Sequence, residues 1–237
     1  MIAIGQFFFR FRNAIFPLVI VLAVLLSRPL YSYGSNGADL LVDLLGIAVI
    51  LAGQALRVAT IGYEYIRRGG RDGRVYAESL VQGGLFAHCR NPLYVGNILM
   101  AIGFLIVIGQ GWLIAAGTAV VVFVYSAIVA AEEDFLSREF GAEYDRYRER
   151  VNRWIPDPRG LRESLAPMRV NWQRVLVKEY NTYFAVLGAL LVIQAWTHVG
   201  EDAMSDARWA WLIIGSGLLI AAYLLVRGLK KRRVLHA

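Results

Sequence analysis

The sequence predicts an all-α integral membrane protein with about six transmembrane helices. Of its 237 residues, 57% are hydrophobic and only 18% are charged, and the mean hydropathy is +0.49. A soluble chain of this length needs a more polar surface than this composition supplies. The apolar residues also gather in runs of about 20, the length that crosses a bilayer as a helix, with most charges between the runs.

Six apolar runs account for the predicted spans. In chain order they are 13–30, 39–61, 92–109, 111–131, 181–199 and 208–227. The first follows the basic residues Arg10 and Arg12, but no small-x-small cleavage site comes after Leu26. We therefore expect a retained helix and not a cleaved signal peptide. Only Gly109, Gln110 and Gly111 separate the third and fourth runs, which predicts a tight antiparallel pair.

The positions of the basic residues predict the orientation. With the amino terminus inside, 22 of the 25 Lys and Arg residues fall in inner segments. The positive-inside rule then puts both termini in the cytoplasm. Four tryptophans lie where an outer aromatic belt is expected: Trp112, Trp196, Trp209 and Trp211. The net charge of +7 fits contact with anionic membrane lipids, and its distribution between the spans predicts no nucleic-acid partner.

We divide the chain into three units: helices one and two (1–61), a central unit with helices three and four (62–158), and a cytoplasmic linker with a carboxyl-terminal transmembrane hairpin (159–237). The cytoplasmic segments 62–91 and 132–180 are longer than simple connections need. Long loops in a compact protein are usually functional or disordered. The functional site is therefore expected in these segments.

The first candidate motif is the turn before the third span. Asn91 and Pro92 are typical of a helix start, with Asn91 as the capping residue and Pro92 in the first position. The free N–H groups and the positive dipole end of that helix suit an anionic group. Arg90 adds a bidentate donor. The alternative is that Asn91 only caps the helix and Arg90 only meets lipid phosphate.

The second candidate motif, Glu132, Glu133 and Asp134, follows the fourth span. The fourth helix is expected to continue beyond these acids, because apolar residues recur at the helical period. They are Leu136, Phe140, Tyr144, Tyr147 and Val151. Gly141 is expected to kink or interrupt this helix. The acids accept hydrogen bonds from a ligand in one interpretation, and pair with Arg138 and Arg148 in solvent in the other.

Single polar residues complete the candidates. Arg57 lies about one turn inside the second span, where an ionisable residue is a functional candidate, although its side chain could instead extend to the interface. Gln54, one turn earlier, could line the same polar site. Cys89 is the only cysteine, which excludes an intrachain disulfide, and we interpret it as a structural residue. His88 is interpreted as a polar loop residue, and no metal site is predicted.

The stretch from Arg90 to Gly96, followed by a helical hairpin and the Glu132–Glu133 pair, resembles the isoprenylcysteine carboxyl methyltransferase and phospholipid methyltransferase superfamily. The tail is similar as well, with Phe140-Gly141, Arg150-Val151 and Ile155-Pro156. The resemblance covers roughly 45–158. It implies an integral membrane enzyme that uses S-adenosyl-L-methionine. It makes 62–158 a methyltransferase-like core with a cytoplasm-facing cofactor pocket.

The resemblance also implies which residues hold the cofactor. They are Gly84, Phe86, Arg90, Asn91, Pro92, Tyr94, Gly96, Glu132 and Glu133. The glutamates would accept hydrogen bonds from ribose hydroxyls or the amino group, and the helix start near Pro92 would bind the carboxylate. Phe86 or Tyr94 would face the sulfonium. Arg57, Tyr147 and Arg150 are catalytic candidates by location alone. An acceptor that is already a carboxylate or an amine needs no general base.

One residue departs from the prenylcysteine branch of this superfamily. That branch usually reads Arg-His-Pro, whereas Asn91 stands in the histidine place here. Asn cannot act as a base near pH 7, which argues against that histidine's role and against a prenylcysteine acceptor. Asn at this point is similar to prokaryotic members. The expected location is therefore the bacterial cytoplasmic (inner) membrane.

The predicted function is methyl transfer from S-adenosyl-L-methionine to a lipid-like or amphiphilic small molecule at the inner membrane face. One alternative is an NADPH-dependent reductase of an isoprenoid or sterol-like lipid, which NADPH and not S-adenosylhomocysteine would stabilise. Another is a non-catalytic membrane scaffold, which would bind neither. The acceptor, the atom methylated, the oligomeric state and the role of the carboxyl-terminal hairpin remain open at this point.

Overall fold

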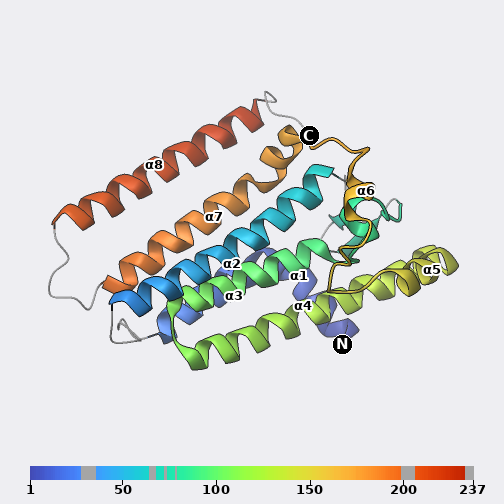
Figure 1. The fold of residues 1–237 in the computed structure, drawn as a ribbon, viewed down its shortest axis with the longest axis horizontal. Helices are drawn as coiled ribbons and strands as arrows, with labels where there is room; N and C mark the ends of the chain where they lie inside the picture. The colour runs from blue at the N-terminus through green and yellow to red at the C-terminus, as the bar shows by residue number, and fades with distance from the viewer. Residues whose placement is uncertain (28–35, 64–67, 72–73, 78, 199–205, 233–237) are drawn as a thin grey trace.

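The computed structural model describes residues 1–27, 36–63, 68–71, 74–77, 79–198 and 206–232. Its long helices lie side by side and run alternately in opposite directions (Figure 1). They are α1 (Ile2–Leu26), α2 (Asn36–Tyr63), α3 (Pro92–Ile108), α4 (Gly111–Phe140), α7 (Trp172–His198) and α8 (Asp206–Lys231). At the end of the bundle where α1 begins and α8 ends lie the short helices α5 (Ala142–Arg150) and α6 (Leu161–Leu165).

The all-α integral membrane class is confirmed, and each predicted span corresponds to a described helix. Among the described residues, four helices are long and apolar enough to cross a membrane, and they lie within α2, α4, α7 and α8. The two halves of α1, inclined at 89°, give a fifth if they form one span. Pro17 lies inside α1 and explains such a bend, because proline removes a helical hydrogen bond. The apolar helix α3 has 17 residues and is about 26 Å long.

Two helices begin at least nine residues earlier than the sequence predicts. The first run was expected from residue 13, whereas α1 begins at Ile2, and the fifth was expected from 181, whereas α7 begins at Trp172. Hydropathy counting misses the first turns of α7 because they carry polar side chains, among them Glu179. In the structure Glu179 is only 1% exposed and forms an ion pair, so it is accommodated in the bundle.

Glycines allow α2 and α3 to pack closely. A Cβ atom placed on Gly53 would lie 2.6 Å from the carbonyl oxygen of Gly96, and one on Gly103 would lie 2.7 Å from that of Gly46. These separations leave no room for a side chain. Small residues let helix backbones approach in this way within membranes. The close approach brings the carboxyl-terminal half of α2 directly against the start of α3.

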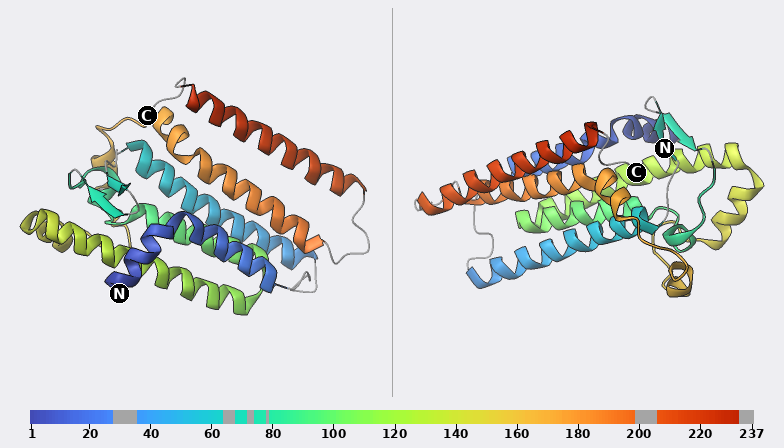
Figure 2. Two further views of the ribbon diagram at one scale, coloured as in Figure 1. Left: turned by 180° about the vertical axis from the view of Figure 1, so that it is seen from behind. Right: turned by 90° about the horizontal axis from the view of Figure 1, so that it is seen from above.

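The predicted continuation of the fourth helix is confirmed. α4 extends through the three acids to Phe140, and Gly141, with φ +49°, separates it from α5. The expected apolar stripe packs as one cluster of Leu136, Tyr144, Tyr147 and Val151 with Ala77. Ala77 ends an antiparallel hairpin that the sequence did not predict, formed by β1 (Arg68–Arg71) and β2 (Arg74–Ala77). The hairpin and α5 lie at the same end of the molecule (Figure 2).

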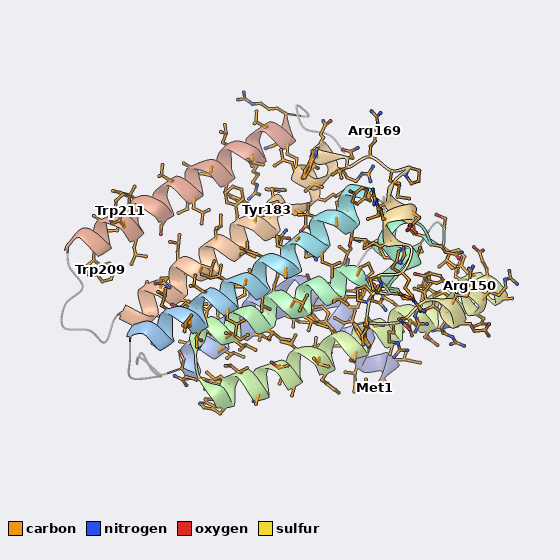
Figure 3. The ribbon with its side chains drawn as sticks, viewed as in Figure 1. Met1, Arg150, Arg169, Tyr183, Trp209 and Trp211 are labelled. Atoms are coloured by element: carbon orange, nitrogen blue, oxygen red, sulfur yellow. The ribbon has the colours of Figure 1, made fainter. Side chains whose placement is uncertain are left out.

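The two ends of the bundle differ in their exposed residues. Trp209 and Trp211 lie at the end of α8 that is farthest from Arg150 and Arg169 (Figure 3). Aromatic residues at one membrane interface and basic residues at the other are typical of an inserted helical bundle. The candidate site lies at the basic end.

Candidate functional site

A returning segment holds the turn before α3. The backbone N–H of Arg90 donates to the carbonyl of Asn152 over 2.8 Å, and that of Asp157 donates to the carbonyl of His88 over 3.0 Å. The Asn91 side-chain amide donates to the carbonyl of Arg153 over 3.2 Å. The tail after α5 therefore lies along 88–91 and fixes the turn in place.

The predicted helix start is confirmed, since α3 begins at Pro92 with Asn91 immediately before it. Asn91 is the N-cap residue, as predicted, but its side chain makes no capping hydrogen bond. Its amide nitrogen is directed instead to the carbonyl of Arg153. Asn91 is 5% exposed, and its role in this structure is to join the turn to the returning segment.

Arg90 and Glu133 meet at this turn. A nitrogen of Arg90 lies 3.6 Å from a carboxylate oxygen of Glu133, and both side chains are about nine-tenths buried. Arg153 also pairs with Glu133, and its Nε donates to Oε1 over 3.2 Å. Burial of a charge is costly unless it is paired. Two guanidinium groups therefore hold the Glu133 carboxylate in one position.

The neighbouring acids have other partners. Tyr94 donates its hydroxyl to Oε1 of Glu132 over 2.6 Å, and the Tyr94 ring lies 5.5 Å from that of Tyr125. Asp134 pairs with the exposed Arg138, as the solvated interpretation predicted for these acids. Glu132 and Glu133 thus face the turn before α3, whereas Asp134 faces away from it.

The residues upstream of the turn are largely enclosed. Gly84, with φ +55°, begins the 3-10 helix η1 (Gly84–Ala87), and Phe86 is 1% exposed. The hydroxyl of Tyr147 donates to the carbonyl oxygen of Phe86 over 2.8 Å. Because Phe86 is so buried, Tyr94 is the more accessible of the two aromatic residues considered for the sulfonium.

The three catalytic candidates lie in separate places. Tyr147 is buried against Phe86. Arg150 is exposed and donates to Oε1 of Gln82 over 3.2 Å. Arg57 lies in the bundle, where its stem contacts Gly96 and its guanidinium pairs with Glu179. Their catalytic roles remain predictions, as do the cofactor contacts of the other candidates.

Cys89 and His88 are enclosed between the turn and the returning segment. Burial raises the pKa of the Cys89 thiol to about 11, against smaller lowering effects of a backbone hydrogen bond at Asn91 and the charge of Arg90. The His88 ring nitrogens lie 2.7 Å from the carbonyl oxygen of Asp157 and 2.9 Å from Oγ of Ser164. Hydrogen bonds from Arg159 lower the pKa of the partly exposed Asp157 carboxyl to about 2. These contacts support structural roles for both residues.

The sequence did not identify Arg153, Asn97 or Glu179 as site residues. Arg153 is one of ten basic residues between 138 and 178, and no local pattern distinguishes it from the others. Asn97 lies within α3, directly after the Arg90–Gly96 stretch, but was not assigned a role. Glu179 lay just outside the predicted span.

The fold and the site together define a helical membrane protein with a buried ion cluster at the basic end of its bundle. Residues 42–143 match the family described as phospholipid methyltransferase. This segment includes both Arg90 and Glu133. It excludes α7 and α8, as the sequence analysis expected for the carboxyl-terminal hairpin.

Curated relatives point to the same superfamily. The chain is 32% identical over 77 residues to the protein-S-isoprenylcysteine O-methyltransferase of Schizosaccharomyces pombe, covering 32% of this chain and 33% of that protein. It is 27% identical over 121 residues to a probable protein-S-isoprenylcysteine O-methyltransferase of Oryza sativa subsp. indica, covering 48% and 61%. No solved structure gives a significant match. The resemblance to the isoprenylcysteine and phospholipid methyltransferase superfamily is thereby confirmed, and the matched part of the chain spans less than two thirds of the length of these relatives.

Proposed function

We propose that this protein transfers a methyl group from S-adenosyl-L-methionine to a lipid-like or amphiphilic acceptor at the inner membrane face. The observation that carries the proposal is the 3.6 Å contact between Arg90 and Glu133. These residues come from distant parts of the family-matched segment and meet at the start of α3. Perturbed or paired charges concentrated at one such place are typical of functional sites.

The side chains of this cluster fit the chemistry of the methyl donor. The donor carries a carboxylate, an amino group, ribose hydroxyls and a sulfonium. Arg90 and the N–H groups at the start of α3 suit the carboxylate, while Glu132 and Glu133 suit the amino group or the hydroxyls. The partly exposed ring of Tyr94 suits a cation, an attraction worth about 0.5–2 kcal/mol. When bound, the donor supplies an electrophilic methyl group.

The chain itself contributes position and fixed charge. Arg90 and Arg153 hold Glu133, and Tyr94 holds Glu132, so both carboxylates are oriented before a ligand arrives. Preorganised charge of this kind needs no rearrangement during the reaction. Correct alignment of acceptor, methyl and sulfur would then account for much of the rate.

The acceptor proposed here is one that is already nucleophilic, such as a carboxylate or an amine. Tyr147 is engaged with the Phe86 carbonyl, and Arg150 lies on the surface. Neither arrangement favours a general base, which must reach the proton it removes. An acceptor that attacks through a free lone pair, with no proton to be removed first, therefore suits this site best.

The basic end of the bundle is proposed to face the cytoplasm, with both termini on that side. The distribution of Lys and Arg supports this orientation, and so does the gathering of α5 and α6 at the end where α1 begins (Figure 1). The soluble cofactor would enter from that end and the lipid-like acceptor from the bilayer. The bacterial inner membrane is the location that the Asn91 variant of the motif favours.

Transfer of a labelled methyl group into a native lipid extract tests this proposal. Purified protein should label a lipid-soluble product, and Glu133→Gln should lower the rate at least tenfold by removing a charge held between two arginines, about 1.4 kcal/mol. Asp134→Asn is the matched control, because Asp134 pairs with the exposed Arg138. Cell-derived vesicles test the proposed orientation. Inside-out vesicles should react with added cofactor, whereas right-side-out vesicles should react only after their membrane is disrupted.

Three results would contradict parts of this proposal. No labelled product from the wild type, together with stabilisation by NADPH, would favour the reductase alternative. Equal rates for Glu133→Gln and Asp134→Asn would remove Glu133 from the site. Reaction in intact right-side-out vesicles would reverse the proposed orientation.

A further inference from the structure

A buried ion pair joins α7 to the family-matched core. Glu179 of α7 is 1% exposed, and its Oε1 lies 2.5 Å from Nη2 of Arg57. The Nε of Arg57 donates to Oε2 over 2.9 Å, and Gln54 donates to the same oxygen over 3.1 Å. Glu179 lies outside residues 42–143. It nevertheless fixes the plane of a guanidinium inside that segment, because a bidentate pair has one preferred geometry.

Arg57 in turn contacts α3. Its Nη1 donates to Oδ1 of Asn97 over 2.6 Å. Its stem lies against Gly96, where an added Cβ would be 2.6 Å from Cγ of Arg57. The position of the Arg57 side chain therefore sets the position of the Asn97 amide.

Asn97 is linked to the candidate cofactor residues through Tyr125. The hydroxyl group of Tyr125, on α4, lies close enough to interact with the Asn97 side chain, and the Tyr125 ring lies 5.5 Å from the ring of Tyr94. Tyr94 is one turn before Asn97 on α3, so the two side chains share a face. The Tyr94 hydroxyl donates to Glu132. Contacts are thus continuous from α7 to Glu132.

We propose that Glu179 is a positioning residue, which holds Arg57 and Asn97 so that Tyr94 is placed correctly against Glu132. This inference rests on the proposed function of the cluster as a cofactor site. It assigns a role to the first helix of the carboxyl-terminal hairpin, beyond packing. A purely structural ion pair would instead hold α7 to α2 with no effect at Tyr94.

The test combines two measurements on the purified full-length protein in lipid nanodiscs. S-adenosylhomocysteine affinity is measured by calorimetry, and the environment of residue 94 by fluorine NMR of 3-fluorotyrosine placed there. Glu179→Gln should weaken binding about tenfold and shift the fluorine signal. Val186→Ala is the matched control, because Val186 lies on the same helix in a separate apolar cluster. Val186→Ala should weaken the packing of α7 but change neither the affinity for S-adenosylhomocysteine nor the fluorine signal of residue 94.

Asn97→Ala provides a second variant, which leaves the Arg57–Glu179 pair intact and keeps the test decisive if Glu179→Gln does not fold. It should also shift the fluorine signal. An unshifted signal in the folded variants, or an equal shift in Val186→Ala, overturns the inference. If the wild type does not bind S-adenosylhomocysteine but the two variants still shift the fluorine signal, the positioning role is supported and the proposed function is contradicted.

Discussion

Three consecutive acids, Glu132, Glu133 and Asp134, leave one turn of α4 in different directions. Successive side chains on an α-helix are rotated by about 100°, so each acid meets a different group. Glu132 accepts from Tyr94, Glu133 pairs with Arg90 and Arg153, and Asp134 pairs with the exposed Arg138. Exposed pairs contribute little to stability, about 0–1 kcal/mol. The same substitution at adjacent positions should therefore have unequal effects.

At Cys89, burial predicts an unreactive thiol. Its pKa, raised from 9.0 to about 11, leaves about a hundredfold less thiolate at pH 8 than an exposed cysteine has, and the thiolate is the reactive form. Above pH 9 the unfolded thiol ionises while the folded one does not, so this group's contribution to stability is lost as the pH rises toward 11. Mass spectrometry after N-ethylmaleimide treatment should find labelling only in denatured protein. Rapid modification of the native protein would contradict this assignment.

Single residues also show where sequence reasoning succeeds. The meeting of Arg90 with Glu133 could be expected because a recognisable motif contains both. The contact of Arg153 with Glu133 could not be expected, since the position of Arg153 depends on how the segment after α5 folds back onto the turn. That return depends on backbone hydrogen bonds between 88–91 and 152–157. Such bonds join main-chain atoms, so the residue types do not reveal them.

The close contact between α2 and α3 leads to a prediction about glycine. Gly96→Ala should destabilise the protein by about 1–3 kcal/mol, because the new methyl group meets the Arg57 stem and the Gly53 carbonyl in a tightly packed interface. Gly217→Ala on α8 is the control, since nothing lies within 4 Å of its Cβ position and alanine favours helix by up to about 1 kcal/mol. Thermal unfolding in detergent measures both, and destabilisation of similar size in the two variants would contradict the close approach.

Helix ends were predictable where local chemistry determines them. Pro92 and Gly141 mark the start of α3 and the end of α4 because their backbones restrict or permit particular conformations. The start of α7 was not predictable from hydropathy. Its polar first turns enter the bundle only because Arg57, more than a hundred residues earlier, pairs with Glu179.

The whole molecule joins a family-matched core to helices outside it. The division at 61/62 and 158/159 remains a prediction. Gly53 and Gly96 join α2 to α3 across the first of these boundaries, and Arg57 and Glu179 join α2 to α7 across both. The exposed face of α8 is apolar, with Trp211, Ile213 and Leu218 each at least two-thirds exposed. Lipid is the natural solvent for such a surface within a membrane.

Binding of S-adenosylhomocysteine tests the central claim, that the Arg90–Glu133 cluster holds a methyl donor. Calorimetry on the purified protein should give micromolar-range affinity. Glu133→Gln should weaken it at least tenfold, about 1.4 kcal/mol, because the variant loses the charge held by Arg90 and Arg153. Asp134→Asn should bind as the wild type does. Wild-type affinity in Glu133→Gln would contradict the account.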